Sequence, residues 1–255
     1  MTIEKLEKYN IFKENIISLD LLENQGFNNI SYLLKTSTNK YILRVFKSNE
    51  SVNISRNFEY EILKKLYKLN ITSKPIFINE EFMIYEFIKG THKTKLSSNE
   101  IKIFANQIKK FHKIKIKTKP YDIKNDLKKY DLFLNDFKSK KILRESIRTI
   151  NAINKFKKEL VLTHHDLNYK NIIFNNSYMK IIDWEYAGTN DRFFDLASFS
   201  IEFNLNMNQE KTLLMNYFDG YCIKKEQKLH LYKRIYKNLC NLWFYKFNKI
   251  NKMYK

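Results

Sequence analysis

The chain has few of the residues that interrupt or cross-link a fold. Its 255 residues include only 4 Gly and 2 Pro, which excludes a collagen-like chain and a Gly/Ser linker protein. Two cysteines, Cys222 and Cys240, are too few for a disulfide framework and are typical of a reducing compartment. No run approaches the roughly 18 consecutive apolar residues of a membrane span, and the start MTIEKLEKYNIFKEN lacks the apolar core of a signal peptide. We therefore expect a cytoplasmic protein without membrane insertion.

Acidic residues are in the minority. The chain has 47 Lys and Arg against 27 Asp and Glu, a formal net charge of +20. By itself this excess favours a nucleic acid or an anionic surface as partner. The lysines are scattered among Asn and Ile along most of the chain, however, which fits a compositional background equally well. We expect no nucleic-acid partner, although part of the charge could attract a nucleotide.

The first third of the sequence predicts a small α/β unit. A short helix is expected at 5–12. Two strands within 30–46, separated by a polar turn at 36–40, are followed by a helix over 53–69 with apolar residues at i, i+4 spacing. Two more strands within 74–88 flank a tight turn, and Gly90 begins a linker.

The rest of the sequence is typical of a mainly helical region. Ser97 and Glu100 form a capping-box pattern that predicts the start of a helix. Further helices are expected at 124–138, 141–158, 191–204, 208–219 and 224–251, with two short strands, NIIF and MKIID, between the second and third of these. The predicted fold class is α+β, with a small β-rich N-terminal lobe (1–88) and a larger, mainly helical C-terminal lobe (89–255).

Three carboxylates and one asparagine, Asp166, Asp183, Glu185 and Asn171, stand among apolar strand-like segments between Leu162 and Gly188. A hairpin formed by NIIF and MKIID would bring Asp183 back beside Asn171, and their oxygen atoms suit a hard cation such as Mg²⁺. Asp166, in the loop before the first strand, could face an incoming hydroxyl group. Each residue alone is typical of a turn. Together they match the catalytic loop and metal-binding aspartate of kinases, which indicates phosphoryl transfer.

Two neighbouring interpretations fit less well. His164 and His165 could suggest a zinc site, but adjacent histidines point in different directions and no Cys or third His is near in sequence. A protein kinase is also disfavoured. The chain has no G-x-G-x-x-G, Asp183 is followed by Trp184 and Glu185 instead of Phe-Gly, and no A-P-E follows.

Three ordered motifs, HHDLNYKNIIF, IIDWEYAG and FFDLASFSIEF, resemble the choline/ethanolamine kinase family, within the aminoglycoside-phosphotransferase-like kinases. Bacterial choline kinases of the Lic type look most similar. The resemblance implies a two-lobed protein-kinase-like fold and transfer of phosphate from ATP to an alcohol. It also implies that Asp166 accepts the proton of the substrate hydroxyl, while Asn171 and Asp183 hold Mg²⁺.

The resemblance extends to the nucleotide side. GFNNISYLL is similar to the family's phosphate-covering loop, and Arg44 stands where protein kinases carry the strand lysine. Its expected partner is Glu59, with Glu61 as the alternative. The segment MIYEFIKG resembles the connector whose backbone binds adenine. The implied ATP-binding residues are Asn28, Asn29, Ser31, Arg44, Glu59, Glu86, Phe87 and Ile88.

The acceptor of such a kinase is an amino alcohol. A quaternary ammonium has no N–H to donate, so aromatic faces and carboxylates must recognise it. The implied acceptor-binding residues are Glu185, Tyr186, Glu202, Phe203, Trp243 and Tyr245. The alternative for the aromatic residues is a place in the core. Only one Trp is present in NLCNLWFYKF, which resembles a W-x-x-W helix, so ethanolamine or another amine stays open as the acceptor.

We therefore predict an ATP- and Mg²⁺-dependent choline kinase that produces phosphocholine. An ethanolamine kinase and an aminoglycoside-type phosphotransferase are the enzyme alternatives. The latter is disfavoured because YCIKKEQKLHLYKRIYKNLCN, near the C-terminus, is rich in Lys and Arg and would repel a polycationic substrate. The alternatives without activity are a pseudokinase, which the intact Asp166, Asn171 and Asp183 disfavour, and a basic nucleic-acid-binding module.

Overall fold

The computed structural model describes every residue except 24, 27, 48–54, 176–177 and 254–255. The described chain divides into two compact units. The first unit comprises Met1–Lys93 and Lys170–Tyr186, and the second comprises Thr94–Tyr169 and Ala187–Lys255. The first unit thus takes in a late segment in addition to the N-terminal residues that the sequence predicted. The tip of the predicted hairpin in that segment, residues 176–177, lies outside the described residues.

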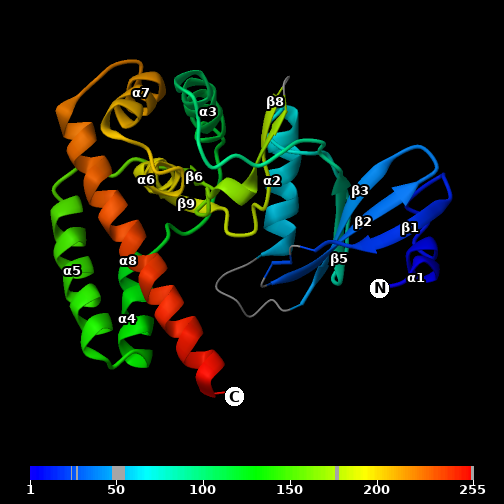
Figure 1. Ribbon diagram of the computed structural model, residues 1–255, viewed down its shortest axis with the longest axis horizontal. Coiled ribbons are helices and arrows are strands. Elements are labelled where there is room, and N and C mark those ends of the chain that lie inside the picture. The colour runs from blue at the N-terminus through cyan, green and yellow to red at the C-terminus, as the bar shows by residue number, and fades with distance from the viewer. Residues whose placement is uncertain (24, 27, 48–54, 176–177, 254–255) are drawn as a thin grey trace. The chain divides into compact units, whose positions relative to one another are not determined.

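A five-stranded sheet forms the centre of the first unit (Figure 1). Its antiparallel strands follow the order β1-β2-β3-β5-β4. The strands are β1 (Ile16–Leu21), β2 (Asn29–Thr36), β3 (Lys40–Phe46), β4 (Pro75–Ile78) and β5 (Phe82–Glu86). The two predicted strand pairs are confirmed, and β1 is an additional edge strand.

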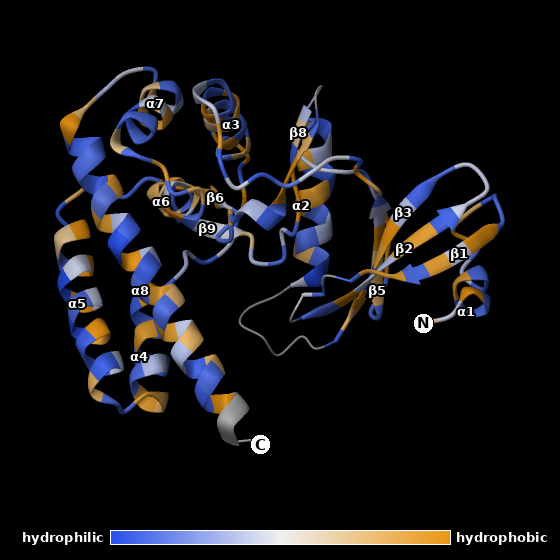
Figure 2. Cartoon of the chain, in the orientation of Figure 1, coloured by the Kyte–Doolittle hydropathy of each residue, from blue (hydrophilic) through white to orange (hydrophobic). Residues whose placement is uncertain are grey.

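Apolar side chains from alternate strand positions build the core of this unit. Leu34, Leu43 and Phe82 are fully buried there, and Leu6 from α1 (Ile3–Glu7) packs against them. Figure 2 shows these strands with orange, apolar segments alternating with blue, hydrophilic ones. The second helix of the unit, α2 (Arg56–Lys68), begins after the N-cap residue Ser55 and carries one of the charged residues described below.

The late segment joins the first unit as a hairpin. Strands β7 (Ile172–Asn175) and β8 (Tyr178–Ile181) pair with each other, and the backbone of Thr91 exchanges hydrogen bonds of 2.8 and 2.9 Å with that of Phe174. Gly90 makes this approach feasible, since a Cβ atom there would lie 2.4 Å from the Phe174 carbonyl oxygen. The hairpin therefore depends on the linker that precedes the second unit.

The second unit is mainly helical. Its helices are α3 (Ser98–Phe111), α4 (Ile123–Phe133), α5 (Phe137–Ile153), α6 (Phe193–Glu202), α7 (Met207–Phe218) and α8 (Ile223–Met253), and a short ladder joins β6 (Leu160–Thr163) to β9 (Gly188–Asp191). The predicted capping box at Ser97 and Glu100 is confirmed. No helix in the described part of the chain combines the length and apolar character that crossing a bilayer would require.

The predicted boundaries of two helices in this unit are wrong. The helix expected at 141–158 is α5, which runs from Phe137 to Ile153. The helix expected at 124–138 ends at Phe133, because Leu134 is extended and its side chain is buried at 1% exposure. Asp136 then begins α5 by accepting a hydrogen bond from the backbone N–H of Ser139 at 3.0 Å. A polar cap and a buried leucine thus separate two helices whose apolar patterns run together in sequence.

Candidate active site

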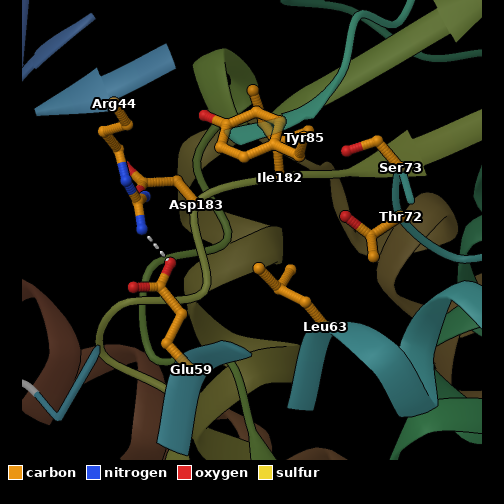
Figure 3. A pocket seen from close by; sticks show the side chains of 8 residues that line it. All are labelled: Arg44, Glu59, Leu63, Thr72, Ser73, Tyr85, Ile182 and Asp183. Atoms are coloured by element: carbon orange, nitrogen blue, oxygen red, sulfur yellow. Dashed lines mark hydrogen bonds and ion pairs between the residues drawn. The ribbon is translucent and has the colours of Figure 1, made fainter. Parts of the chain in front are cut away.

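A buried charge cluster surrounds Arg44 in the first unit (Figure 3). Strand β3 holds this side chain at 4% exposure, where one guanidinium nitrogen donates to Glu59 of α2. Another nitrogen, Nη1, donates to Asp183 Oδ1 at 2.9 Å. The predicted pairing of Arg44 with Glu59 is confirmed, whereas the alternative, Glu61, is exposed and pairs with Lys64. One arginine therefore connects strand, helix and the residue that follows the hairpin.

Electrostatics keeps this arginine charged. Burial alone would lower the pKa of Arg44, but the charge of Glu59, aided by that of Asp183, raises it above its ordinary value. Tyr85 lines the same pocket and stays neutral, because burial raises its pKa to about 12. Figure 3 shows Leu63 and Ile182 completing the apolar side of this pocket. The pocket thus contains a fixed cation whose charge is held in place by carboxylates.

Glu185 occupies a second position in the same network. Its carboxylate accepts hydrogen bonds from Asn28 Nδ2 at 2.7 Å, Asn29 Nδ2 at 2.8 Å and Arg56 Nη1 at 2.9 Å. Burial would raise the pKa of Glu185, but the charge of Arg44 and these three hydrogen bonds outweigh it, and the pKa is lowered. Two predicted phosphate-loop residues thus bind a predicted acceptor residue directly.

Arg56 is a site residue that the sequence interpretation missed. Its guanidinium bridges the carboxylates of Glu185 and Glu59, the latter at 3.4 Å, and lies 4.3 Å from the centre of the Phe46 ring. The available signal was the spacing R-x-x-E in SRNFEYE, which places Arg56 and Glu59 on one face of a helix. Arg56 therefore links the residues that hold Arg44 to those that hold Glu185.

The predicted metal ligands are also neighbours in the first unit. The backbone N–H of Ile182 donates to the carbonyl of Asn171 at 2.9 Å, which continues the β7–β8 ladder and brings Asp183 next to Asn171. Asp183 has a φ of 62°, in the left-handed region that few non-glycine residues adopt. Its side chain is 38% exposed. A carboxylate and an amide oxygen at this place fit Mg²⁺, which prefers oxygen ligands.

No group of three or more His, Cys, Asp or Glu side chains able to hold a metal occurs within the described ranges. Asn171 and Asp183 would supply two oxygen ligands to an Mg²⁺ ion. That is the usual arrangement where the remaining ligands are waters and substrate phosphates. The donor set is thus compatible with Mg²⁺ bound together with a nucleotide.

The predicted catalytic residue, Asp166, lies in the loop after β6 in the second unit. The loop is held by Asp195, a fully buried residue of α6, whose carboxylate accepts the backbone N–H groups of His164 at 2.8 Å and His165 at 3.0 Å. His165 has a φ of 70°, another left-handed conformation. Asn168 Nδ2 donates to Asp166 Oδ1 at 2.9 Å. Asp195 therefore fixes the backbone from which the Asp166 side chain projects.

A buried histidine supports Asp195 from the other side. His112 Nε2 lies 3.1 Å from Asp195 Oδ2, and His112 Nδ1 lies 2.6 Å from the hydroxyl of Tyr217. Burial lowers the pKa of His112, so the ring is neutral near pH 7. Burial would raise the pKa of Asp195, but its hydrogen bond with His112 contributes to a net lowering. None of these three residues was predicted as part of the site.

A carboxylate and a tyrosine mark the predicted acceptor side of the second unit. The hydroxyl of Tyr236, on α8, donates to Glu202 Oε1 at 3.0 Å. Burial raises the pKa of Glu202, and the charge of Asp166 adds to this rise. Cys240 lies beside the same group, and burial raises the pKa of its thiol to about 11. Tyr236 and Cys240 were not predicted, although their spacing of one helical turn was visible in the sequence.

The predicted aromatic residues of α8 point in different directions. Tyr236, Cys240 and Trp243 share one face of the helix because they follow its period, and Trp243 stacks on Phe247 with ring centres 5.3 Å apart. Tyr245 lies about half a turn farther round the helix than Tyr236. The helix period therefore favours Trp243 over Tyr245 on the side that carries Tyr236.

The other predicted site residues are placed as follows. Phe203 is 3% exposed and packs against Phe199 with ring centres 4.8 Å apart, so it is a core residue at the end of α6. The hydroxyl of Tyr186 accepts a 2.7 Å hydrogen bond from Asn28 Nδ2 in the first unit. The predicted adenine-binding segment, Glu86, Phe87 and Ile88, follows directly from β5, and Ser31 lies on β2. Their roles stay predictions.

Comparison with known families decides the relationship. A family model described as choline/ethanolamine kinase matches residues 18–239. The chain belongs to the choline/ethanolamine kinase family. This family consists of ATP-dependent phosphotransferases. The family match confirms the resemblance that was seen in the sequence. The predicted kinase-like α+β fold is also confirmed.

Individual relatives agree with this assignment. A LicA homologue from Metamycoplasma hominis is 39% identical over 80 residues, which cover 31% of this chain and 31% of that protein. The choline kinase LicA of Streptococcus pneumoniae has a crystal structure that superposes with a TM-score of 0.80 at 21% identity, covering 97% of this chain and 91% of that one. A spectinomycin phosphotransferase has a TM-score of 0.68 at 14% identity, covering 91% and 83%. The fold is thus shared with the aminoglycoside phosphotransferases, while the sequence match to the curated relative spans about a third of its length.

Proposed function

We propose that this choline/ethanolamine kinase family member transfers the γ-phosphoryl group of ATP to the hydroxyl of choline, giving phosphocholine and ADP. One observation carries the choice of acceptor. Within the second unit, Asp166 lies near enough to Glu202 for its charge to raise the pKa of Glu202, and Tyr236 contacts the same carboxylate. Choline has a hydroxyl at one end and a cation at the other. A proton acceptor and a carboxylate–aromatic pair on one unit suit these two ends.

The proposed roles follow from the chemistry of each side chain. Asp166 orients the choline hydroxyl and accepts its proton as the bond to phosphorus forms. Glu202, in its ionised form, balances the trimethylammonium charge, which needs no hydrogen bond. Tyr236 holds that carboxylate in place through its hydroxyl group. Most of the rate enhancement comes from the positioning of the two ends of choline.

The nucleotide would be bound by residues of the first unit. Arg44 presents a permanent charge for the ATP phosphates, and Glu59 holds it in one orientation. Asn171 and Asp183 would hold Mg²⁺, which neutralises negative charge on the phosphates when it is bound. Because Asp183 pairs with Arg44 at 2.9 Å, the same carboxylate orients the arginine and offers an oxygen to the cation. The chain thus contains each residue type that the reaction needs.

The test is ADP release with Mg·ATP and a panel of acceptors: choline, ethanolamine, an aminoglycoside and no acceptor. Asp166→Asn keeps the size of the side chain but removes its basicity, and we expect kcat to fall by about 10³-fold. Asp131→Asn is the matched control, because Asp131 is an exposed residue of the same unit whose ion-pair partner in the described part of the chain is Lys140. This control should keep the rate of the wild type.

The panel separates the proposal from its alternatives. Choline turnover with little ethanolamine turnover supports the proposal. Faster turnover of ethanolamine would assign the second activity of the family instead, since Glu202 can also accept hydrogen bonds from a primary ammonium. Aminoglycoside turnover would overturn the amino-alcohol assignment. ATP binding without turnover of any acceptor would refute catalysis and favour a pseudokinase.

A further inference from the structure

The most exposed apolar side chains of the described chain lie together at one end of the second unit. Leu132, in the last turn of α4, is 85% exposed, and Phe137, in the first turn of α5, is 82% exposed. They flank the short connection between the two helices. Figure 2 shows the joined ends of α4 and α5 as a mixture of orange and blue residues. Neither residue contributes to the core.

A row of cations continues from Phe137 along α5. Lys141, Arg144 and Arg148 follow it at i+4, i+7 and i+11, so the four residues share one face of the helix. They line a surface hollow together with Lys140 and Glu145. We call Leu132, Phe137, Lys141, Arg144 and Arg148 the basic apolar tip.

The charge of this surface is not balanced by the protein. Among the described residues, no carboxylate lies within 4 Å of the charged groups of Lys141, Arg144 or Arg148. The one carboxylate in the hollow, Glu145, is approached by Arg234 of α8 at 3.7 Å, which adds a further positive charge. Lys141, Arg144 and Arg148 thus have no ion-pair partner among the described residues, whereas Lys140 in the same hollow pairs with Asp131.

Helix α8 extends the same surface. Lys249 Nζ donates to the carbonyl of Phe133 at 2.8 Å, and Lys246 Nζ lies 5.6 Å from the Phe133 ring centre, so the last turns of α8 lie beside the end of α4. Phe244, on these turns, is 57% exposed. Exposed apolar groups and lysines thus occur together on three helix ends that are close in space.

We propose that the basic apolar tip binds the surface of an anionic phospholipid bilayer as a peripheral contact. Leu132 and Phe137 enter the headgroup layer, and Lys141, Arg144 and Arg148 lie against the lipid phosphates. An anionic bilayer offers an apolar environment for the exposed side chains of the tip and negative charge for its cations. The rest of the described chain supplies neither to these residues. Such contact requires no helix that spans the membrane.

Two other occupants fit the tip less well. A second copy of the chain in a two-fold contact would place the cation row against itself, which like charges disfavour. A soluble polyanion would satisfy the cations, but it would leave Leu132 in water, because an aliphatic side chain has no ring face on which a base could stack. The combination of charge with an aliphatic tip favours lipid.

The experiment is co-sedimentation of the full chain with phosphatidylcholine vesicles, with and without phosphatidylglycerol, at about 0.1 M salt, where charge interactions extend roughly 10 Å. The wild type should bind only the vesicles that contain phosphatidylglycerol. Lys141→Gln/Arg144→Gln/Arg148→Gln should weaken binding by roughly 100-fold, since each cation near an anionic surface contributes about 5-fold. Leu132→Ser/Phe137→Ser should weaken it by roughly 10-fold or more.

Matched controls keep this test specific. Lys102→Gln/Lys110→Gln/Lys113→Gln makes the same change in net charge at exposed positions on and next to α3. Met207→Ser/Ile223→Ser removes two exposed apolar side chains elsewhere, which are 74% and 56% exposed. Both controls should bind vesicles as the wild type does. All variants should keep their phosphotransferase rate without vesicles.

Three outcomes would overturn the proposal. The first is no binding to vesicles that contain phosphatidylglycerol. The second is equal loss in the tip variants and the charge control, which would assign the binding to net charge alone. The third is full binding by Leu132→Ser/Phe137→Ser together with equally tight binding of heparin, which would make the cation row a polyanion site.

Discussion

Replacing Glu59 by Gln tests the buried charge cluster of the first unit most directly. Glu59 is 1% exposed and faces two arginines, Arg44 at 4% and Arg56 at 8% exposure. The substitution keeps the shape of the side chain but leaves two buried cations with one less counter-charge. Removing one partner of a buried ion pair costs about 3–5 kcal/mol. At roughly 2–4 °C per kcal/mol for a chain of this size, the melting temperature should fall by roughly 6–20 °C.

Glu61→Gln is the matched control on the same helix. Glu61 is exposed and pairs with Lys64 three residues away, an interaction worth about 0.3–0.5 kcal/mol. Its loss should shift the melting temperature by about 2 °C at most. Thermal unfolding and the KM for ATP should be measured for both variants, and only Glu59→Gln should raise that KM. Equal melting temperatures for the two variants would refute the cluster as a source of stability.

Three further predictions concern single side chains. Burial raises the pKa of Glu202, so this carboxylate becomes protonated at a higher pH than an ordinary glutamate does. The kcat/KM for choline should therefore fall as the pH drops through this raised pKa. Glu202→Gln should abolish that acid limb in a pH–rate profile, lower kcat/KM, and raise the melting temperature at neutral pH, where the buried charge is unfavourable. In the Asp195→Asn variant the side chain cannot accept hydrogen bonds from both backbone N–H groups of the catalytic loop. Denaturant unfolding should therefore show a free energy of unfolding that is lower by about 1–3 kcal/mol. The kcat should fall by a larger factor than the KM for ATP changes. Gly90→Ala would place a Cβ atom 2.4 Å from the Phe174 carbonyl oxygen and should lower the free energy of unfolding by about 1–3 kcal/mol. Gly220→Ala is the control and should lower it less, because no atom lies within 4 Å of its Cβ position. Similar melting curves for the two variants would contradict the packing argument.

Local sequence signals were sufficient for most helices and for the central strands. The capping box at Ser97, the apolar period of α2 and the polar turn after Thr36 each act within a few residues, so they can be recognised without a structure. Strand β1 escaped prediction because it is an edge strand with a register shift near Ile16, and its burial does not alternate cleanly. The boundary between α4 and α5 escaped because the burial of Leu134 comes from tertiary packing.

The candidate site shows the same division. Asp166, Asn171 and Asp183 were found because their spacing is a short-range pattern. Arg56 is separated from Glu185 by 129 positions in the sequence, and Asn28 is separated from it by 157. No local signal in the sequence specifies these two contacts. His112 is likewise recognisable only once Asp195 and Tyr217 are placed around it. Sequence patterns therefore identified the residues proposed to react and the Arg44–Glu59 pair, but not Arg56, Asp195 or His112, which position other site residues.

The late hairpin of the first unit has a consequence for synthesis on the ribosome. The first unit includes Lys170–Tyr186, and Ile181 donates a 2.8 Å backbone hydrogen bond to Ile71. A ribosome adds about 5–20 residues per second, so the 93 residues from Thr94 to Tyr186 separate the early part of this unit from its completion by roughly 5–20 s. During this interval the two strands of the hairpin, β7 and β8, have not yet been synthesised. The N-terminal segment therefore cannot complete its fold as an independent early domain, and a chain cut after Lys93 would lack both the hairpin and Asp183.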